Sequence, residues 1–350
     1  MQQKNKILGN NESTESYTTF NKRYKKQELV LGKEGQKKLA KAAVAIVGLG
    51  ALGSNCVELL VRAGVGKLIL IDRDVISLDN LQRQHLYDEN DIGKAKAIVC
   101  EQKLRKINGS IDIIGKLADI TWKNIHEILK NIDCIIDCTD NLFTRMLLND
   151  FCVKNDVPLI HGAVVSSKGS LYVVSGKEKA CLACIYSDKI NHETCDSTGV
   201  LNTASSIVSS LQANECIKLI WDKHPVEPDF LRIDLLRNSF ERFGVKKNKN
   251  CFVCIKKEFR YLLGRIEQKA VHYCGSFQYQ IKKKDFSKKS SFLKKEYIEI
   301  VSKLKKLGKV VDLGYCAHFD DLTLFLDGRV LIKAKDEKEA KMFFDKYIGN

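Results

Sequence analysis

The stretch that decides the fold is "AVAIVGLGALGSNCVELLVRAGVGKLILID", residues 43–72. Its first eight residues predict a short buried strand that ends in glycines, and its last six predict a second buried strand. The residues between them predict a helix that is closed by Gly64 and Gly66. Strand, helix and strand together make a βαβ unit, in which the two strands are parallel.

Helices and strands continue to alternate after this unit. This alternation is typical of an α/β fold with a Rossmann-like, doubly wound, mostly parallel sheet that binds ligands at the carboxyl ends of its strands. Residues 264–350 change in pattern and predict a small α+β C-terminal module, while residues 1–22 predict a polar N-terminal arm. We predict helices over 28–41, 93–108, 124–131, 142–156 and 205–222, strands over 111–119 and 133–140, and extended segments over 158–176.

The composition leads us to expect a cytoplasmic protein. No apolar run is long enough to span a bilayer, and the polar start lacks the apolar core of a signal peptide. In a reducing compartment the spaced pairs among the 13 cysteines are expected to serve metal binding or catalysis rather than disulfides, whereas cysteines on apolar strands and helices are expected to be small core residues. The formal charge of +15 comes without a nucleic-acid-binding motif, so we interpret it as a solvated lysine-rich surface; the alternative is a surface that attracts an acidic protein partner. We expect neither a nucleic-acid nor a membrane partner.

Three glycines follow the first strand of the βαβ unit. Gly48, Gly50 and Gly53 match G-x-G-x-x-G between a strand and a helix, the setting in which this motif places a phosphate on a helix N-terminus. Asp72 ends the next strand, where a carboxylate accepts hydrogen bonds from both hydroxyls of a ribose. NAD and ATP both carry such a ribose, so these residues alone do not choose between them.

The segment "IDRDVISLDNLQRQ", residues 71–84, favours ATP. Attack on a phosphorus needs cations and Mg²⁺ to absorb charge on the phosphate oxygens, whereas hydride transfer does not. Asp74 begins a loop that delivers Arg83, and Lys94 and Lys96 open the following helix. Asp140 ends a later strand and offers the hard oxygen ligand that Mg²⁺ prefers. We therefore expect an adenylation site.

Four segments, in this order, carry a family resemblance: "RYKKQ" (23–27), "GLGALGS" (48–54), "DRDVISLDNLQRQHLYDENDIGKAKA" (72–97) and "CTDNLFTR" (138–145). They resemble the ThiF/MoeB/HesA superfamily of ubiquitin-activating-enzyme-like adenylyltransferases, over residues 23 to about 255. We therefore assign residues 23–263 to one ATP-binding adenylyltransferase domain.

The resemblance implies roles for single residues. Asp72 would bind the adenosine ribose, and Arg83 and Lys96 would contact the ATP phosphates. Asn80 and Gln84 would shape the phosphate pocket.

The remaining site residues follow from the same resemblance. Asp140 would hold Mg²⁺, and Asp74 joins the cofactor-binding set. Arg23 would reach into the site of a partner subunit and implies a homodimer, although Lys26 stands where the family usually has a second arginine.

Two C-x-x-C pairs predict a metal site. Cys181 with Cys184 and Cys251 with Cys254 supply four thiolates, which suit a tetrahedral Zn²⁺ with no position left for substrate. The metal is therefore expected to be structural and to lie within the adenylyltransferase domain. The same two pairs occur in ThiF and MoeB, in keeping with the resemblance.

Cys195 lies outside both pairs, in "HETCDSTGVLNTASS" (192–206), ahead of a predicted helix. Oriented amides at a helix N-terminus favour a thiolate. By resemblance, Cys195 could form an acyl-disulfide, a persulfide or a thioester after adenylation; the alternative is a loop cysteine without a catalytic role. We count it with Arg83, Lys96 and Asp140 as candidate catalytic residues.

The resemblance implies a reaction. A small ubiquitin-like sulfur-carrier protein with a C-terminal Gly-Gly would be adenylated on its terminal carboxylate, with ATP and Mg²⁺, and activated for thiocarboxylate formation in thiamine, molybdopterin or related thio-cofactor biosynthesis. The C-terminal module lacks the cysteine loop of a rhodanese, so we expect a separate sulfur-donor protein. The alternatives are adenylation of another carboxylate, such as a peptide terminus, or of a tRNA base, and a nucleotide-binding scaffold or NAD-dependent oxidoreductase.

Overall fold

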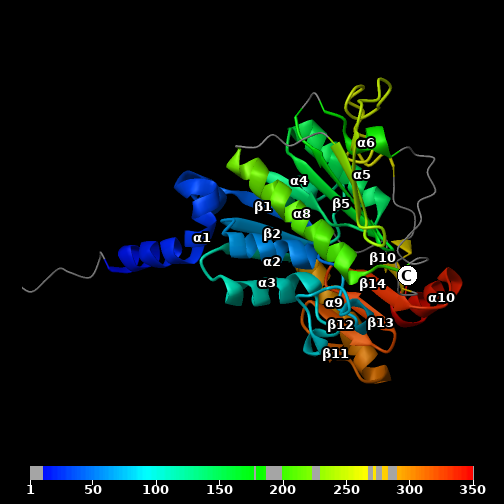
Figure 1. Cartoon of the computed structure of the whole chain (residues 1–350). Helices are drawn as coiled ribbons and strands as arrows, with labels where there is room; N and C mark the ends of the chain where they lie inside the picture. The colour runs from blue at the N-terminus through cyan, green and yellow to red at the C-terminus, as the bar shows by residue number, and fades with distance from the viewer. Residues whose placement is uncertain are drawn as a thin grey trace, which may run out of the picture.

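The computed structural model describes residues 11–176, 179–186, 199–222, 229–266, 271–272, 278–282 and 290–349, of which residues 11–21, 271–272, 278, 282 and 290–293 are described by their backbone alone. Within them the adenylyltransferase domain holds an eight-stranded sheet, in the order β3-β2-β1-β4-β5-β6-β7-β8 (Figure 1). The strands are β1 (Ala43–Val47), β2 (Lys67–Asp72), β3 (Asp112–Leu117), β4 (Cys134–Asp137), β5 (Leu159–Val165), β6 (Lys168–Val174), β7 (Asp229–Asp234) and β8 (Ser239–Gly244).

The five strands from β3 to β5 pair in parallel, and β5, β6, β7 and β8 pair antiparallel. This arrangement confirms the predicted doubly wound, mostly parallel sheet. The antiparallel hairpin of β7 and β8 was not predicted. On β8 every residue but the first is exposed, so this strand lacks the run of apolar residues by which a buried strand is recognised.

Helices cover both faces of the sheet. Val44 and Ile46 of β1 pack with α2, α3 and α8, whereas Ala45 and Val47, on the other face of the same strand, pack with α4, α5 and α6. This alternation follows from the two-residue period of a strand. The helices are α1 (Asn11–Lys41), α2 (Gly53–Ala63), α3 (Lys96–Ile107), α4 (Ile125–Ile128), α5 (Leu142–Asn155), α6 (Leu182–Ile185) and α8 (Asn202–Trp221).

Helix α1 is longer than the sequence predicted. The predicted helix starts at residue 28, but α1 begins at Asn11 and is interrupted at Gly32, which has φ 72° and ψ 164°. The predicted end of the polar arm at residue 22 therefore falls inside a helix. No helix in the described part of the chain is both long and apolar enough to cross a bilayer.

The C-terminal module has its own sheet and its own core. Its six described strands take the order β11-β12-β13-β14-β10-β9, and α9 and α10 pack on them (Figure 1). The predicted α+β character is confirmed. The elements are β9 (Val271–His272), β10 (Gln278–Lys282), α9 (Ser290–Leu307), β11 (Val311–Asp312), β12 (Cys316–Phe319), β13 (Leu322–Phe325), β14 (Arg329–Lys333) and α10 (Glu337–Tyr347).

The register of the parallel strands brings polar residues to one edge of the main sheet. Val47 of β1 lies beside Ile71 of β2 and beside Asp137 of β4. The three strands therefore end side by side, and the residues that follow them lie along the same edge of the sheet. They form the carboxyl edge where ligands bind in this class of sheet.

Candidate nucleotide site and thiol cluster

The turn after β1 depends on two of its glycines. Gly48 has φ 89°, and a Cβ placed on it would lie 2.6 Å from the carbonyl oxygen of Cys138. A Cβ on Gly53 would lie 1.9 Å from the carbonyl oxygen of Gly48. A side chain at Gly48 would therefore collide with the segment after β4, and one at Gly53 would force the start of α2 away from the turn. A Cβ on Gly50 would lie 3.7 Å from Nε2 of Gln84, an ordinary van der Waals distance, so this position does not require glycine for space.

Asp72 fastens the glycine turn to the loop after β2. Its Oδ2 accepts a hydrogen bond from the Leu49 amide at 2.6 Å, and its Oδ1 accepts one from the Asp74 amide at 2.7 Å. The hydroxyl of Tyr87 donates to the Leu49 carbonyl at 3.0 Å and holds the same turn from the other side. A carboxylate has about four lone-pair directions, so Asp72 keeps acceptor capacity for the two hydroxyls of a ribose.

Asp74 and Lys96 form a largely buried ion pair beside Asp72. Nζ of Lys96 lies 3.7 Å from Oδ2 of Asp74, and the Lys96 amide donates to the Asp74 carbonyl at 3.0 Å. The pKa of Asp74 is raised to about 6, chiefly by burial; the charges of Lys96 and Arg73 limit the rise, and those of Asp72 and Asp140 add to it. These charges act on one carboxylate because they converge at this edge.

Two residues in the turn between Asp74 and Lys96 have buried side-chain amide groups. Asn80 donates from Nδ2 to Oδ2 of Asp79 at 3.0 Å, and Gln84 is buried beside the glycine turn. Oε1 of Gln84 and Oδ1 of Asp74 are buried oxygens without a hydrogen-bond partner in the described residues. Buried polar atoms are normally paired, so these two oxygens favour a ligand at this edge.

Arg83 and Asp140 are the accessible members of the candidate site. Arg83 is half-buried and donates from Nη1 to the Asp79 carbonyl at 2.8 Å, which holds its guanidinium against its own turn. Asp140 is exposed just after β4, and Nδ2 of Asn141 lies 3.5 Å from its Oδ1. We call Gly48, Asp72, Asp74, Lys96 and Asp140, with the turn residues Asn80, Arg83 and Gln84, the nucleotide edge.

A buried hydrogen-bonded chain lies behind Asp140. Nδ1 of His161 lies 2.8 Å from Oδ2 of Asp137, and its Nε2 lies 2.8 Å from the Tyr186 hydroxyl. Oδ1 of Asp137 accepts hydrogen bonds from the amide and the hydroxyl of Thr139, at 2.9 and 2.6 Å. The chain thus fixes the start of the turn that carries Asp140.

The protonation states of this chain follow from its surroundings. Burial alone would raise the pKa of Asp137, but hydrogen bonds from His161 and Thr139 and the charge of Arg145 hold it below its ordinary value. Burial lowers the pKa of His161, so its imidazole is neutral at pH 7. A carboxylate only accepts, so His161 carries its proton on Nδ1 and accepts from the Tyr186 hydroxyl at Nε2.

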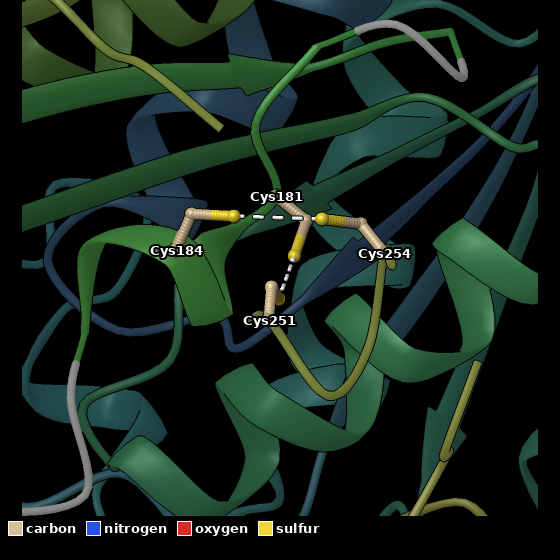
Figure 2. Close-up of side chains that lie close together, drawn as sticks. All are labelled: Cys181, Cys184, Cys251 and Cys254. Atoms are coloured by element: carbon tan, nitrogen blue, oxygen red, sulfur yellow. Dashed lines mark hydrogen bonds between the residues drawn. The ribbon is translucent and has the colours of Figure 1, made fainter. Parts of the chain in front are cut away.

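Figure 2 shows the thiol cluster, formed by Cys181, Cys184, Cys251 and Cys254. All four Sγ atoms lie within 4.8 Å of one another; Cys181 and Cys251 are 3.6 Å apart, and Cys184 and Cys254 are 3.4 Å apart. These separations are too long for a disulfide, whose S–S bond is about 2.05 Å. They suit tetrahedral Zn²⁺, because Zn–S bonds of about 2.3 Å place sulfurs about 3.8 Å apart.

The surroundings of the thiols also fit a cation. Burial and the neighbouring thiols of Cys184 and Cys251 raise the pKa of Cys254 to about 12, because thiolates crowded together without a counter-charge are unfavourable. A dication removes that penalty. The Asn248 amide donates to Cys184 Sγ at 3.4 Å, as amides do around metal-bound thiolates.

A family model described as the ThiF family matches residues 24–253. The chain belongs to the ThiF family. It is 36% identical over 341 residues to the sulfur carrier protein ThiS adenylyltransferase of Bacillus subtilis (strain 168), which covers 93% of this chain and 99% of that protein. The ThiS adenylyltransferase of Escherichia coli (strain K12) is 33% identical over 236 residues, which are 66% of this chain and 94% of that protein.

Solved structures show the same fold. The crystal structure of Escherichia coli MccB with ATP aligns with a TM-score of 0.59 at 21% identity, over 71% of this chain and 82% of that one. At this identity the likeness concerns the fold alone. It places this chain's large sheet among ThiF-like folds.

Some of the site residues that the sequence predicted do not lie at the nucleotide edge of this chain. Arg23 is exposed and donates from Nη1 to the Ile107 carbonyl at 3.2 Å. That carbonyl ends the 12-residue helix α3, which begins at Lys96 and is about 18 Å long. Within one chain, therefore, Arg23 lies away from the nucleotide edge. Lys94 pairs with Asp91 at 3.7 Å instead of joining the edge, and Cys195 lies outside the described residues.

Sequence reasoning missed three residues of this ThiF-family site. His161 stands alone in an apolar strand, and its partners Asp137 and Tyr186 are 24 and 25 residues away. The only sequence signal was a histidine inside a buried strand that ends at the carboxyl edge.

Proposed function

We propose that this protein is an adenylyltransferase that joins AMP to the C-terminal glycine carboxylate of a small ubiquitin-like sulfur-carrier protein. Membership of the ThiF family and the two named ThiS adenylyltransferases support the class of reaction. The observation that carries the proposal is the convergence of Asp72, Asp74, Lys96 and Asp140 beside the glycine turn. An oxidoreductase would not need this set of charges.

ATP would bind along the nucleotide edge. Its phosphates would lie near Gly50, at the N-terminus of α2, where backbone amides favour anions. Asp72 would accept from the ribose hydroxyls, while Arg83 and Lys96 would approach the phosphates. The unpaired oxygens of Asp74 and Gln84 support a ligand or its bound water at this place.

Asp140 is the residue that would hold Mg²⁺, since its exposed carboxylate offers a hard oxygen ligand. When bound, Mg²⁺ supplies positive charge to the phosphate oxygens. The buried Asp137 and His161 would keep the turn that carries Asp140 in one conformation.

The chemistry asks the protein for alignment and charge neutralisation. A carboxylate oxygen of the carrier attacks the α-phosphorus, the bond from that phosphorus to the bridging oxygen breaks, and pyrophosphate leaves with the electron pair. The product is a carrier acyl-adenylate. A carboxylate is already a nucleophile, so no general base is required. Lys96 and Arg83 would offset the charge that builds on the phosphate.

The thiol cluster would hold Zn²⁺ in a structural role. Its four sulfurs fill the coordination sphere, so the metal has no open position for substrate. It would tie the segment after β6 to the segment after β8 and so fix the far part of the main sheet.

Three further features belong to the same proposal. Arg23 would complete the nucleotide edge of a second copy in a homodimer, since it lies away from the edge of its own chain. Cys195 would take part after adenylation, and sulfur would come from a separate donor protein. We place the reaction in the cytoplasm, in keeping with the free cysteines of the described residues.

Pyrophosphate exchange tests the proposal. Purified protein with MgATP and a Gly-terminated carrier should exchange labelled pyrophosphate into ATP, and mass spectrometry should detect the carrier adenylate. The matched control is the same carrier without its two terminal glycines, which should give neither signal. Binding of nicotinamide coenzymes alone, with no exchange for any Gly-terminated carrier, would contradict the proposal.

A further inference from the structure

The C-terminal module lies against the loop that carries the nucleotide edge. In Figure 1 the orange and red elements of the module lie against one end of the main sheet. Cys316, Phe325 and Leu331 of the module pack with Val75 and Leu117 of the main domain in one small hydrophobic cluster. Val75 follows Asp74 directly, so this cluster reaches the loop within one residue of the Asp74–Lys96 ion pair.

That loop closes on itself at its base. Val75 and Ala95 form an antiparallel bridge, the Ile76 amide donates to the Lys94 carbonyl at 2.9 Å, and the Gly93 amide donates to the Ile76 carbonyl at 2.8 Å. Residues 73–76 and 93–96 are therefore the two arms of one clamp. Asn80, Arg83 and Gln84 lie between the arms, and Asp74 and Lys96 lie on them.

The module grips the first arm through Arg329 of β14. This side chain is buried, with a relative exposure of 1%, and its Nη1 donates to the Arg73 carbonyl at 2.9 Å. Nε donates to Oδ2 of Asp327 at 2.7 Å, and the guanidinium lies 4.5 Å from the centre of the Phe325 ring. The ion pair and the ring hold the guanidinium in place, so the Arg73 backbone receives a donor of fixed direction.

The module grips the second arm through His318 of β12. Its Nε2 lies 2.7 Å from the Gly93 carbonyl, and its Nδ1 lies 3.0 Å from the Thr323 hydroxyl. A carbonyl only accepts, so Nε2 carries a proton and donates to Gly93, while Nδ1 is hydrogen-bonded to the Thr323 hydroxyl.

Gly93 shows how closely the two parts fit. It has φ 84°, and a Cβ placed on it would lie 3.4 Å from Nε2 of His318. The loop conformation that glycine permits is thus the one that brings its carbonyl to the module.

We propose that the C-terminal module braces the 73–96 loop, with Arg329 and His318 as positioning residues that hold the two arms of the clamp in the conformation that binds ATP. This inference rests on the proposed function, because it takes the side chains of that loop as ATP contacts. It gives the module a role that its sequence does not reveal. Neither residue touches the nucleotide; each acts through a backbone carbonyl of the loop.

Variants of the full-length protein test the brace. His318→Ala removes the donor to Gly93, and Arg329→Met removes the donor to Arg73; each should weaken MgATP binding about 5- to 10-fold in calorimetry, in line with loss of one buried hydrogen bond. His318→Gln retains an N–H donor and should bind within about 2-fold of wild type. Lys333→Met, an exposed residue on the same strand as Arg329, is the matched control and should leave binding unchanged.

Hydrogen exchange supplies a readout that needs no ATP. In His318→Ala and Arg329→Met the amides of Ile76, Gly93 and Lys96, which close the clamp, should exchange faster than in wild type, while the amides of β1 should not. Unchanged loop exchange and unchanged ATP affinity in both variants would overturn the brace while leaving the proposed function intact. Wild-type protein that binds no MgATP would overturn the proposed function instead, and the role in ATP binding with it.

Discussion

In the thiol cluster all four sulfurs already lie within 4.8 Å of one another, whereas at the nucleotide edge Arg83 is held against its own turn and Asp140 is exposed. The cluster is assembled by buried segments on both sides of it. At the edge, Asp72 and the glycine turn are held by hydrogen bonds. Arg83 and Asp140 would have to turn toward a bound ligand. Substitutions in the thiol cluster should therefore lower the stability of the protein, whereas substitutions at the nucleotide edge should lower its turnover.

Removal of two thiols is the largest expected effect. Cys251→Ser combined with Cys254→Ser should abolish zinc binding and lower the free energy of unfolding by about 3–5 kcal/mol, or a Tm fall of roughly 10 °C, because the metal cross-link is lost. Metal analysis and calorimetry measure both. Cys216→Ala, a buried thiol outside the cluster, is the control and should keep the metal. If wild-type protein from which the metal has been removed keeps the Tm of the untreated protein, the zinc assignment is wrong.

Asp140→Ala should separate turnover from stability. The variant loses the carboxylate that would hold Mg²⁺, so kcat in pyrophosphate exchange should fall at least about 100-fold. The Tm should stay within about 2 °C of wild type, since the side chain is exposed. Glu127→Ala, another exposed acid, should change neither quantity. Full activity of Asp140→Ala would exclude its role.

His161→Phe probes the chain behind the edge. It leaves the buried Asp137 carboxylate without its imidazole partner, so the free energy of unfolding should fall by about 1–3 kcal/mol. Tyr186→Phe removes only the outer hydroxyl of the same chain and should cost about 1 kcal/mol. Urea denaturation measures both. Equal losses in the two variants would show that Asp137 does not depend on His161.

Asp74 gives the smallest effect, visible in its pH dependence. Its folded pKa of about 6 exceeds the ordinary value of 3.8, so between these values the folded protein holds a proton that the unfolded chain has released. Stability from this group therefore falls as pH rises through that window. Asp74→Asn removes the effect, and its stability relative to wild type should increase by about 1 kcal/mol from pH 5 to pH 7.5 in urea denaturation. A constant difference between the two proteins across this range would contradict the raised pKa.

The sequence predicted those parts of the molecule that depend on neighbours along the chain. The βαβ unit, the helix over 93–108 and the paired cysteines have local signatures, and the structure has the elements and the four close sulfurs. Leu49 of the glycine turn and Asp72 meet because parallel strands end at one level. The roles given to the site residues, Asp72, Lys96, Arg83, Asp140, Arg23 and Cys195 among them, stay predictions.

The parts that sequence did not reveal rest on contacts between distant segments or with backbone atoms. Arg329 and His318 bind carbonyl oxygens of Arg73 and Gly93, and every residue has a carbonyl, so no residue type marks such a partner. The length of α1 was underestimated because its polar first half has no apolar stripe to mark it as helical.

The thiol cluster has a consequence for how a newly made chain matures. Two of its four sulfurs come from residues 251 and 254, whereas the parallel half of the sheet ends at Val165. A chain grows from its N-terminus and folds in that direction during translation. The cysteines that complete the cluster are therefore synthesised after the glycine turn and before the C-terminal module. On the two proposals made above, zinc would be captured by chains whose nucleotide edge does not yet have the module beside it.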